Sequence, residues 1–209
     1  STSSAASDVY KRQVGDNVGD IAGMGSDIFE SYCGAMIASI AIAATVGNTD
    51  LMFLPLWLAA LGLFCSLIGI GIVRSQVSRS PAVALRLGTF FSPIVFLIIA
   101  AMSISKSPNI EMNIFYSVLT GAVGGILIGL ITEYYTGGST ESSPVGKIAK
   151  SGETGPATVM ITGLSVGMQS VVMPLFVIAA IIGLSTNFSG LYGVGLSLIH
   201  ISEPTRLEP

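Results

Sequence analysis

Charged residues are scarce in this sequence. Only 10% of its 209 residues are Asp, Glu, Lys or Arg, whereas a soluble domain carries about 25%. Hydrophobic residues make up 51% of the chain and the mean hydropathy is +0.77, so too little polar surface is left to face water. The net charge of −3 argues against a nucleic-acid surface. We therefore expect membrane lipid around this chain and no nucleic-acid partner.

Cysteine and histidine are nearly absent. Cys33 and Cys65 both lie in apolar runs, which indicates buried free thiols rather than a disulfide framework. The single histidine, His200, follows the last complete apolar run, and a lone histidine is weak evidence for a metal site. We assign His200 no function.

Long hydrophobic runs are abundant instead. A membrane-spanning helix needs about 20 mostly apolar residues. A sixth run begins near Asn187, and five complete runs precede it: 21–46, 51–73, 83–105, 112–135 and 156–183. The sequence therefore predicts an all-α membrane protein, a polytopic helical bundle with five or six membrane-spanning helices.

Basic residues indicate how this bundle is oriented. If the runs alternate in direction, two loops lie on one side, and both carry positive charge. The opposite side has only Lys106 near a helix end. The basic residues of the two loops are Arg74, Arg79, Arg86, Lys147 and Lys150. The positive-inside rule makes these loops cytoplasmic, together with the start of the first run. The longer loop, 136–155, is polar and rich in Gly and Ser, as expected outside lipid.

An acidic stretch precedes the first run. It reads "VGDNVGDIAGMGSDIFES" and spans residues 14–31. At about 100° per residue, its oxygen-bearing side chains share one helix face roughly 100° wide and extend about 20 Å along the axis. These residues are Asp16, Asp20, Asp27, Glu30 and Ser31. We call them the acidic stripe.

Two readings of the acidic stripe compete. Asp16 and Asp20 suit a helix start, where negative charge is favourable. Asp27 and Glu30 lie deeper, where ionised carboxylates are costly unless they are paired, hydrated or bound to a metal. Oxygen ligands one turn apart suit magnesium that bridges a phosphate substrate. Spacing alone supports a metal or cation site that is joined to an ion path.

The acidic stretch closely resembles the motif of the membrane-integral pyrophosphatases, which couple pyrophosphate hydrolysis to sodium or proton pumping. The similarity continues in "ITEYYT", "SPVGKIAKSGETGPATVMITGL" and "LYGVGLS". By this resemblance, Asp16 is a magnesium–pyrophosphate ligand. Asp20 orients and deprotonates the attacking water and is also a metal ligand. Asp27 is the ion-gate aspartate, and Glu30 and Ser31 are the gate glutamate and its neighbour.

The gate also implies an ion. Plant-type proton pumps carry the gate glutamate one turn later, at the position of Gly34. Glu30 with Gly34 favours the prokaryotic sodium-pumping kind, although some bacterial proton pumps share this placement. The resemblance implies Mg²⁺ as cofactor, with K⁺ and Na⁺ as further ions, and Na⁺ or H⁺ as the transported ion.

The family fold implied by the resemblance is a homodimer of 16-helix subunits. For this protein we expect a prokaryotic cell membrane, with the catalytic end in the cytoplasm. This chain would supply the sixth to tenth helices and the start of the eleventh. It would hold about half a catalytic site and hydrolyse nothing alone. Two alternatives remain: a cation-coupled secondary transporter without hydrolysis, and a purely structural membrane segment.

The two ends depart from the family pattern. The family repeats its motif upstream, so an aspartate is expected where Arg12 stands. The end segments "DVYKRQ" and "SLIHISEPTR" resemble translated sequencing adapters. We therefore expect residues 1–13 and 197–209 to be a non-native leader and tail around a family segment, 14–196.

Overall fold

The computed structural model describes residues 2–75, 81–108, 110–137 and 143–202, and all regular structure among them is helical. Arg79, residue 1 and residues 203–209 lie outside the described residues, as does the side chain of Arg86. The elements in chain order are α1 (Thr2–Val46), α2 (Thr49–Ser75), α3 (Pro81–Ser105), α4 (Met112–Thr136), α5 (Pro144–Ser151), a 3₁₀ turn (Gly152–Thr154) and α6 (Pro156–Ser202).

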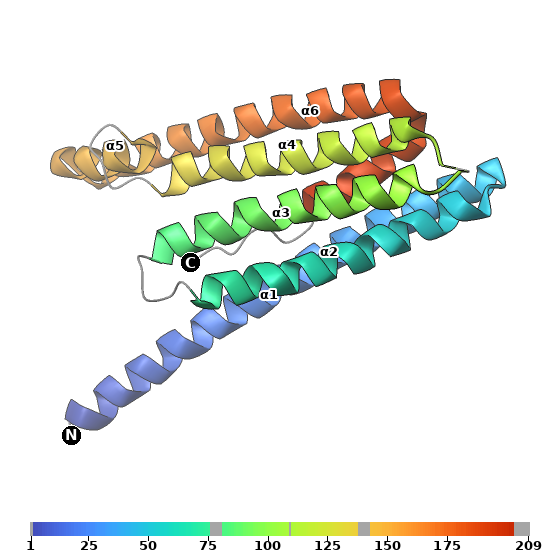
Figure 1. Ribbon diagram of the computed structural model, residues 1–209. Helices are drawn as coiled ribbons and strands as arrows, with labels where there is room; N and C mark the ends of the chain where they lie inside the picture. Colours follow the sequence, from blue (N-terminus) through green and yellow to red (C-terminus); the bar gives the residue numbers. More distant parts are fainter. Residues whose placement is uncertain (1, 76–80, 109, 138–142, 203–209) are drawn as a thin grey trace.

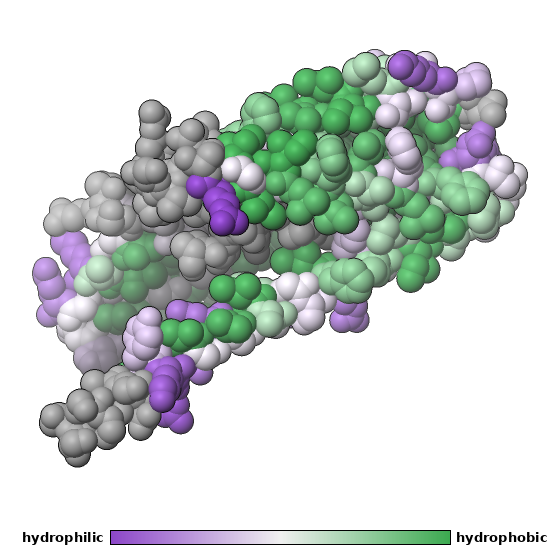
Figure 2. Space-filling view, turned by 60° about the horizontal axis from the view of Figure 1, so that its bottom comes forward, coloured by the Kyte–Doolittle hydropathy of each residue, from purple (hydrophilic) through white to green (hydrophobic). Residues whose placement is uncertain are grey.

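The long helices run alternately up and down along one bundle (Figure 1). Each predicted run falls within a helix, which confirms the polytopic all-α fold. Among the described residues, four helices are long and apolar enough to cross a membrane. The apolar part of α3 whose side chains are described, Phe90–Ser105, is shorter than these four. Apolar residues cover most of the face seen in Figure 2, while polar residues gather toward the ends of the bundle. The chain is therefore an integral membrane protein.

The first helix is longer than its apolar run. It was predicted to span 21–46, but α1 begins at Thr2. The polar residues before position 21 continue the helix without a break. The N-terminal part of α1 diverges from the other helices, whereas its C-terminal part packs beside α2 and α6 (Figure 1).

The last helix is broken near its C-terminal end. Ser189 and Gly190 have non-helical backbone angles, with φ +61° and ψ −152° at Gly190. The chain turns there and returns through the bundle (Figure 1). This return segment, residues 191–202, corresponds to the sixth predicted run, which begins a few residues later than expected. Most of its residues are buried, so it fills the centre of the bundle.

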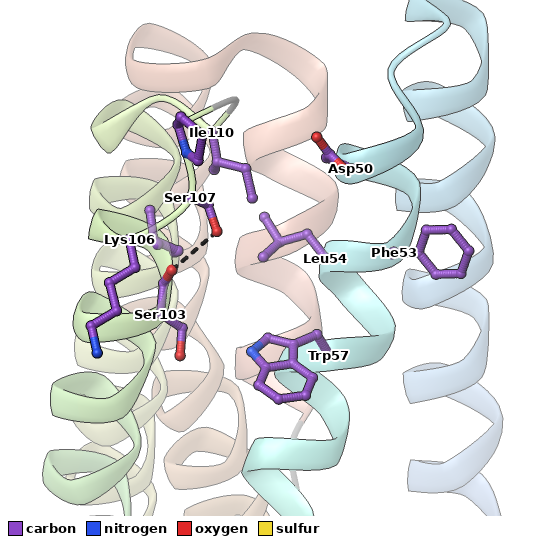
Figure 3. A pocket seen from close by; sticks show the side chains of 10 residues that line it. Asp50, Phe53, Leu54, Trp57, Ser103, Lys106, Ser107 and Ile110 are labelled. Atoms are coloured by element: carbon purple, nitrogen blue, oxygen red, sulfur yellow. Dashed lines mark hydrogen bonds between the residues drawn. The ribbon is translucent and has the colours of Figure 1, made fainter.

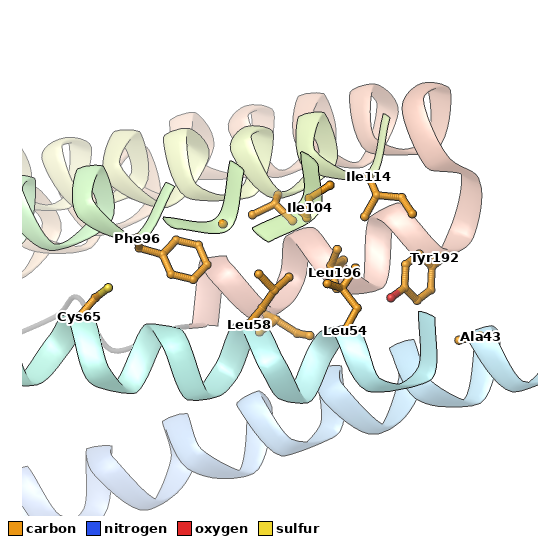
Figure 4. Packing of buried hydrophobic residues seen from close by; sticks show 12 residues of the cluster. Ala43, Leu54, Leu58, Cys65, Phe96, Ile104, Ile114, Tyr192 and Leu196 are labelled. Atoms are coloured by element: carbon orange, nitrogen blue, oxygen red, sulfur yellow. The ribbon is translucent and has the colours of Figure 1, made fainter. Parts of the chain in front are cut away.

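The core is built around the return segment. Tyr192, Leu196 and Ile199 pack with buried residues of α1 to α4 (Figure 4). The Tyr192 hydroxyl donates a hydrogen bond of 2.7 Å to the Leu51 carbonyl oxygen. Both cysteines are free thiols. Cys65 is buried in this core, as predicted, whereas Cys33 is only half-buried.

Small residues let the return segment approach α4. A Cβ atom placed on Gly121 would lie 2.5 Å from the Ser197 carbonyl oxygen, and one on Gly125 would lie 3.4 Å from the His200 carbonyl oxygen. A side chain at Gly121 would therefore push the two helices apart.

The polar loop between the fourth and fifth runs contains a short helix that the sequence interpretation missed. Ser143 is the N-cap of α5, and its Oγ accepts a hydrogen bond of 3.0 Å from the Gly146 N–H. Pro144 occupies the first turn, where its missing N–H costs nothing. The Ser-Pro pair was the signal for this helix.

Candidate functional site

The acidic stripe lies entirely on α1. Because α1 is one uninterrupted α-helix over Thr2–Val46, the predicted angular relation between the five side chains holds. Asp16 and Asp20 are about 6 Å apart along the axis, and Asp27 is about 10 Å beyond Asp20. All five side chains are exposed in this chain.

The stripe points away from the helices that α1 packs against. Ala35, Ser39 and Ala43 contact or approach the core, and all three lie about 100–180° around the helix from Asp16. The stripe is centred near Asp16 itself. The described part of the chain therefore leaves the acidic face uncovered, and any group that binds these carboxylates approaches from the opposite side.

The acidic face has free space beside it. Gly23 and Gly34 share this face, and a Cβ atom on either residue would meet nothing within 4 Å. A ligand, an ion or another helix can therefore approach the backbone of α1 between the carboxylates.

Positive charge lies at the same end of the bundle as the start of α1. Arg74 lies in the last turn of α2, and Lys147 and Lys150 lie on α5; all three side chains are exposed. Figure 1 places the end of α2, α5 and the N-terminal part of α1 at one end. The grouping predicted from alternating runs is thus present in the structure for these residues.

The described residues do not make a complete metal site by themselves. They contain no group of three Asp, Glu, His or Cys side chains that could hold a metal ion. Asp16 and Asp20 do offer hard carboxylate oxygens on one face, one turn apart, which are the ligands that magnesium prefers. The donor set therefore fits magnesium in kind, and further ligands are needed to complete its coordination.

Sequence reasoning missed one feature at the other end of the bundle. A cavity of about 500 Å³ lies where the start of α2 meets the end of α3, and it is lined by charged and aromatic side chains. Its residues are far apart in the chain, so spacing gave no signal. Lys106 was noticed only as a charge near a helix end.

Comparison with known proteins places these features in a family. Residues 8–201 match the model of the family described as inorganic H⁺ pyrophosphatase. The match extends beyond 14–196 at both ends, and the non-native leader and tail stay a prediction.

Three curated relatives illustrate the similarity. A Clostridium tetani protein named "Putative K(+)-stimulated pyrophosphate-energized sodium pump" is 39% identical over 93% of this chain and 30% of its own length. A Bacteroides thetaiotaomicron protein of the same name is 37% identical over 89% of this chain and 29% of its own length. A Moorella thermoacetica protein named "K(+)-insensitive pyrophosphate-energized proton pump 2" is 40% identical over 81% of this chain and 26% of its own length.

The chain thus spans between 26% and 30% of the length of these relatives. Sodium and proton pumps both occur among them, and their names distinguish potassium-stimulated from potassium-insensitive forms. The family match covers nearly the whole chain and includes the acidic stripe. The chain therefore belongs to the family described as inorganic H⁺ pyrophosphatase.

Proposed function

We propose that this chain is part of a pyrophosphate-energised ion pump, in which hydrolysis of pyrophosphate drives Na⁺, H⁺ or both across a membrane. The observation that carries the proposal is the acidic stripe, which runs along one open face of α1 in a member of this family. A membrane helix with carboxylates at successive depths provides a hydrolytic site at its polar end and an ion path below it.

Asp16 and Asp20 form this chain's share of the hydrolytic site. Asp16 offers carboxylate oxygens to the magnesium-bound substrate, and Asp20 orients the attacking water. As that water bonds to phosphorus, Asp20 takes its proton and the bond to the bridging oxygen breaks, which releases two phosphates. Magnesium, when bound, neutralises charge on the phosphate oxygens.

Asp27, Glu30 and Ser31 form the gate. They lie at positions i, i+3 and i+4 of one helix, so their oxygens project from the same face. Two carboxylates and a hydroxyl suit a small hard cation, whereas a proton needs only one carboxylate. We therefore propose Na⁺ as the transported ion. We also propose K⁺ as a further activating ion, because the Clostridium tetani relative is named as K⁺-stimulated.

The basic residues at one end of the bundle indicate how the protein is oriented in the membrane. Arg74, Lys147 and Lys150 lie at the end where the acidic stripe begins, and basic residues favour the cytoplasmic side. We place the hydrolytic end in the cytoplasm of a prokaryotic cell and the whole protein in a homodimer. The remaining ligands come from the part of the protein that lies beyond this chain and covers the open face of α1.

The test is Asp20→Asn in the full-length protein, with phosphate release from pyrophosphate as the readout. Loss of a positioned base should lower the rate by about 10²-fold or more. Glu111→Gln is a matched control, because Glu111 is exposed at the N-cap of α4, at the other end of the bundle. Both variants should elute as assembled protein. Activity of Asp20→Asn within a few-fold of Glu111→Gln would remove Asp20 from this role.

A further inference from the structure

A cavity lies at the end of the bundle opposite the proposed hydrolytic site, and the proposed pump mechanism assigns no role to the residues that line it. It lies between α2 and α3 and has a volume of about 500 Å³, within the range of small-molecule sites, about 300–1,000 Å³. Asp50 and Lys106 carry its charges. Trp57, Leu54 and Ile104 provide an aromatic and apolar wall.

The cavity reaches from the helix ends into the apolar part of the bundle. Asp50 is in the first turn of α2, and Lys106 directly follows the last residue of α3. Trp57 lies two turns further along α2, about 10 Å deeper than Asp50. Tryptophan is enriched at the boundary between headgroups and acyl chains. In Figure 3 the Lys106 side chain runs back along α3, so its ammonium group lies near the depth of Trp57 at this boundary. The cavity therefore crosses the membrane interface.

Around the cavity, the apolar side chains Leu54 and Trp57 line the α2 side, whereas serine and lysine side chains line the side of α3 and the residues that follow it. In Figure 3, Leu54 and Trp57 on α2 lie opposite Ser103 on α3 and Ser107 just beyond its end, and Lys106 extends along α3. The Ser103 and Ser107 hydroxyls donate to the carbonyl oxygens of Ile99 and Ser103, at 2.9 and 3.2 Å. Their oxygen atoms are thus fixed and remain able to accept a hydrogen bond from a ligand.

We propose that this cavity binds the headgroup of an amine-bearing phospholipid, such as phosphatidylethanolamine. The ligand's phosphate pairs with the Lys106 ammonium group, and its primary amine lies by the Asp50 carboxylate and donates to the serine oxygens. The glycerol and upper acyl chains lie against Trp57 and Leu54. Opposite charges on the two sides of one interfacial cavity match a zwitterion better than a purely anionic lipid, and the surrounding membrane supplies the ligand directly.

The amine is what distinguishes this ligand from phosphatidylcholine. A quaternary ammonium group has no N–H, so it cannot donate to Asp50, Ser103 or Ser107. Free phosphate lacks both the amine and the apolar part. The three probes therefore separate the contributions of phosphate, amine and acyl chains.

The experiment is native mass spectrometry of the full-length protein in detergent with added phosphatidylethanolamine, phosphatidylcholine of the same acyl chains, or inorganic phosphate. We expect the parent protein to retain phosphatidylethanolamine preferentially. Lys106→Gln should weaken retention of both lipids about tenfold, the scale of one hydrogen bond to a charged group. Lys106→Arg, which keeps the positive charge, should retain both lipids as the parent does. Asp50→Asn should remove the preference for the amine while phosphatidylcholine binding stays unchanged.

Lys150→Gln is the matched control, because Lys150 is also exposed but lies on α5, at the other end of the bundle. Its lipid retention should equal that of the parent, and every variant should elute as assembled protein. The proposal is overturned if Lys106→Gln behaves as Lys150→Gln does, or if the parent shows no preference for phosphatidylethanolamine. Equal occupancy by inorganic phosphate also overturns it. None of these readouts depends on pyrophosphate hydrolysis, so they test the lipid site separately from the proposed pump.

Discussion

At the residue scale, the position of one glutamate on α1 carries the proposed choice of ion. Glu30 shares a helix face with Asp27 and Ser31, one turn or less away. Gly34 lies on that same face one turn further along, about 6 Å from Glu30 along the axis. Moving the carboxylate to position 34 would separate it from Asp27 and disperse the oxygen cluster.

We therefore predict that Glu30→Gly combined with Gly34→Glu in the full-length protein loses sodium stimulation of pyrophosphate hydrolysis. Within this chain a Cβ atom on Gly34 meets nothing within 4 Å, so no residue described here opposes the new side chain. Phosphate release measured over a range of sodium concentrations provides the readout. Glu111→Gln is the control and should keep the parent's sodium response. A double variant that is still stimulated by sodium would contradict the proposed gate.

At the scale of elements, the sequence predicted the helices well and their breaks poorly. Apolar runs bounded by polar turns located all five main helices, because the length of a span is set by the bilayer. The polar start of α1 was missed, since polarity does not end a helix. The return segment was anticipated only as a run near Asn187. Its buried position depends on contacts with four other helices, which periodicity cannot reveal.

The acidic face of α1 also shows how far the candidate site could be predicted from the sequence. Helical spacing was enough to put the five side chains of the acidic stripe on one face, because a single helix fixes that relation. Which way the face points was not predictable, since it depends on which side of α1 packs through Ser39 and Ala43. The cavity beside Trp57 likewise needed two helix ends to be brought together.

The break in α6 gives a prediction at this scale. Gly190 has φ +61° and ψ −152°, a region that residues with a Cβ atom occupy only at a cost of about 1–3 kcal/mol. Gly190→Ala should therefore lower the thermal unfolding midpoint of the full-length protein in detergent.

Gly183→Ala is the matched control for this change. Gly183 lies in the helical part of α6, and a Cβ atom there meets nothing within 4 Å, so this variant should unfold no earlier than the parent. If the two alanine variants had equal midpoints, the break would not require glycine.

At the scale of the whole molecule, this chain is a membrane bundle with one functional face left open. Its helices pack around the return segment, while the acidic stripe faces away from that core. In the proposed pump, further helices would cover the acidic stripe, which would account for its exposed carboxylates. The chain spans about three tenths of the length of the Clostridium tetani relative. A secondary transporter with the same stripe would bind a cation but would need no pyrophosphate.

The most direct test of the central claim is sodium uptake by sealed vesicles that contain the full-length protein. We predict that sodium accumulates against its gradient only when pyrophosphate and magnesium are both present, and that Asp20→Asn abolishes both uptake and phosphate release. Vesicle acidification without any sodium requirement would replace sodium by protons as the cargo. Sodium flux that proceeds without pyrophosphate hydrolysis would contradict the account and favour a secondary transporter.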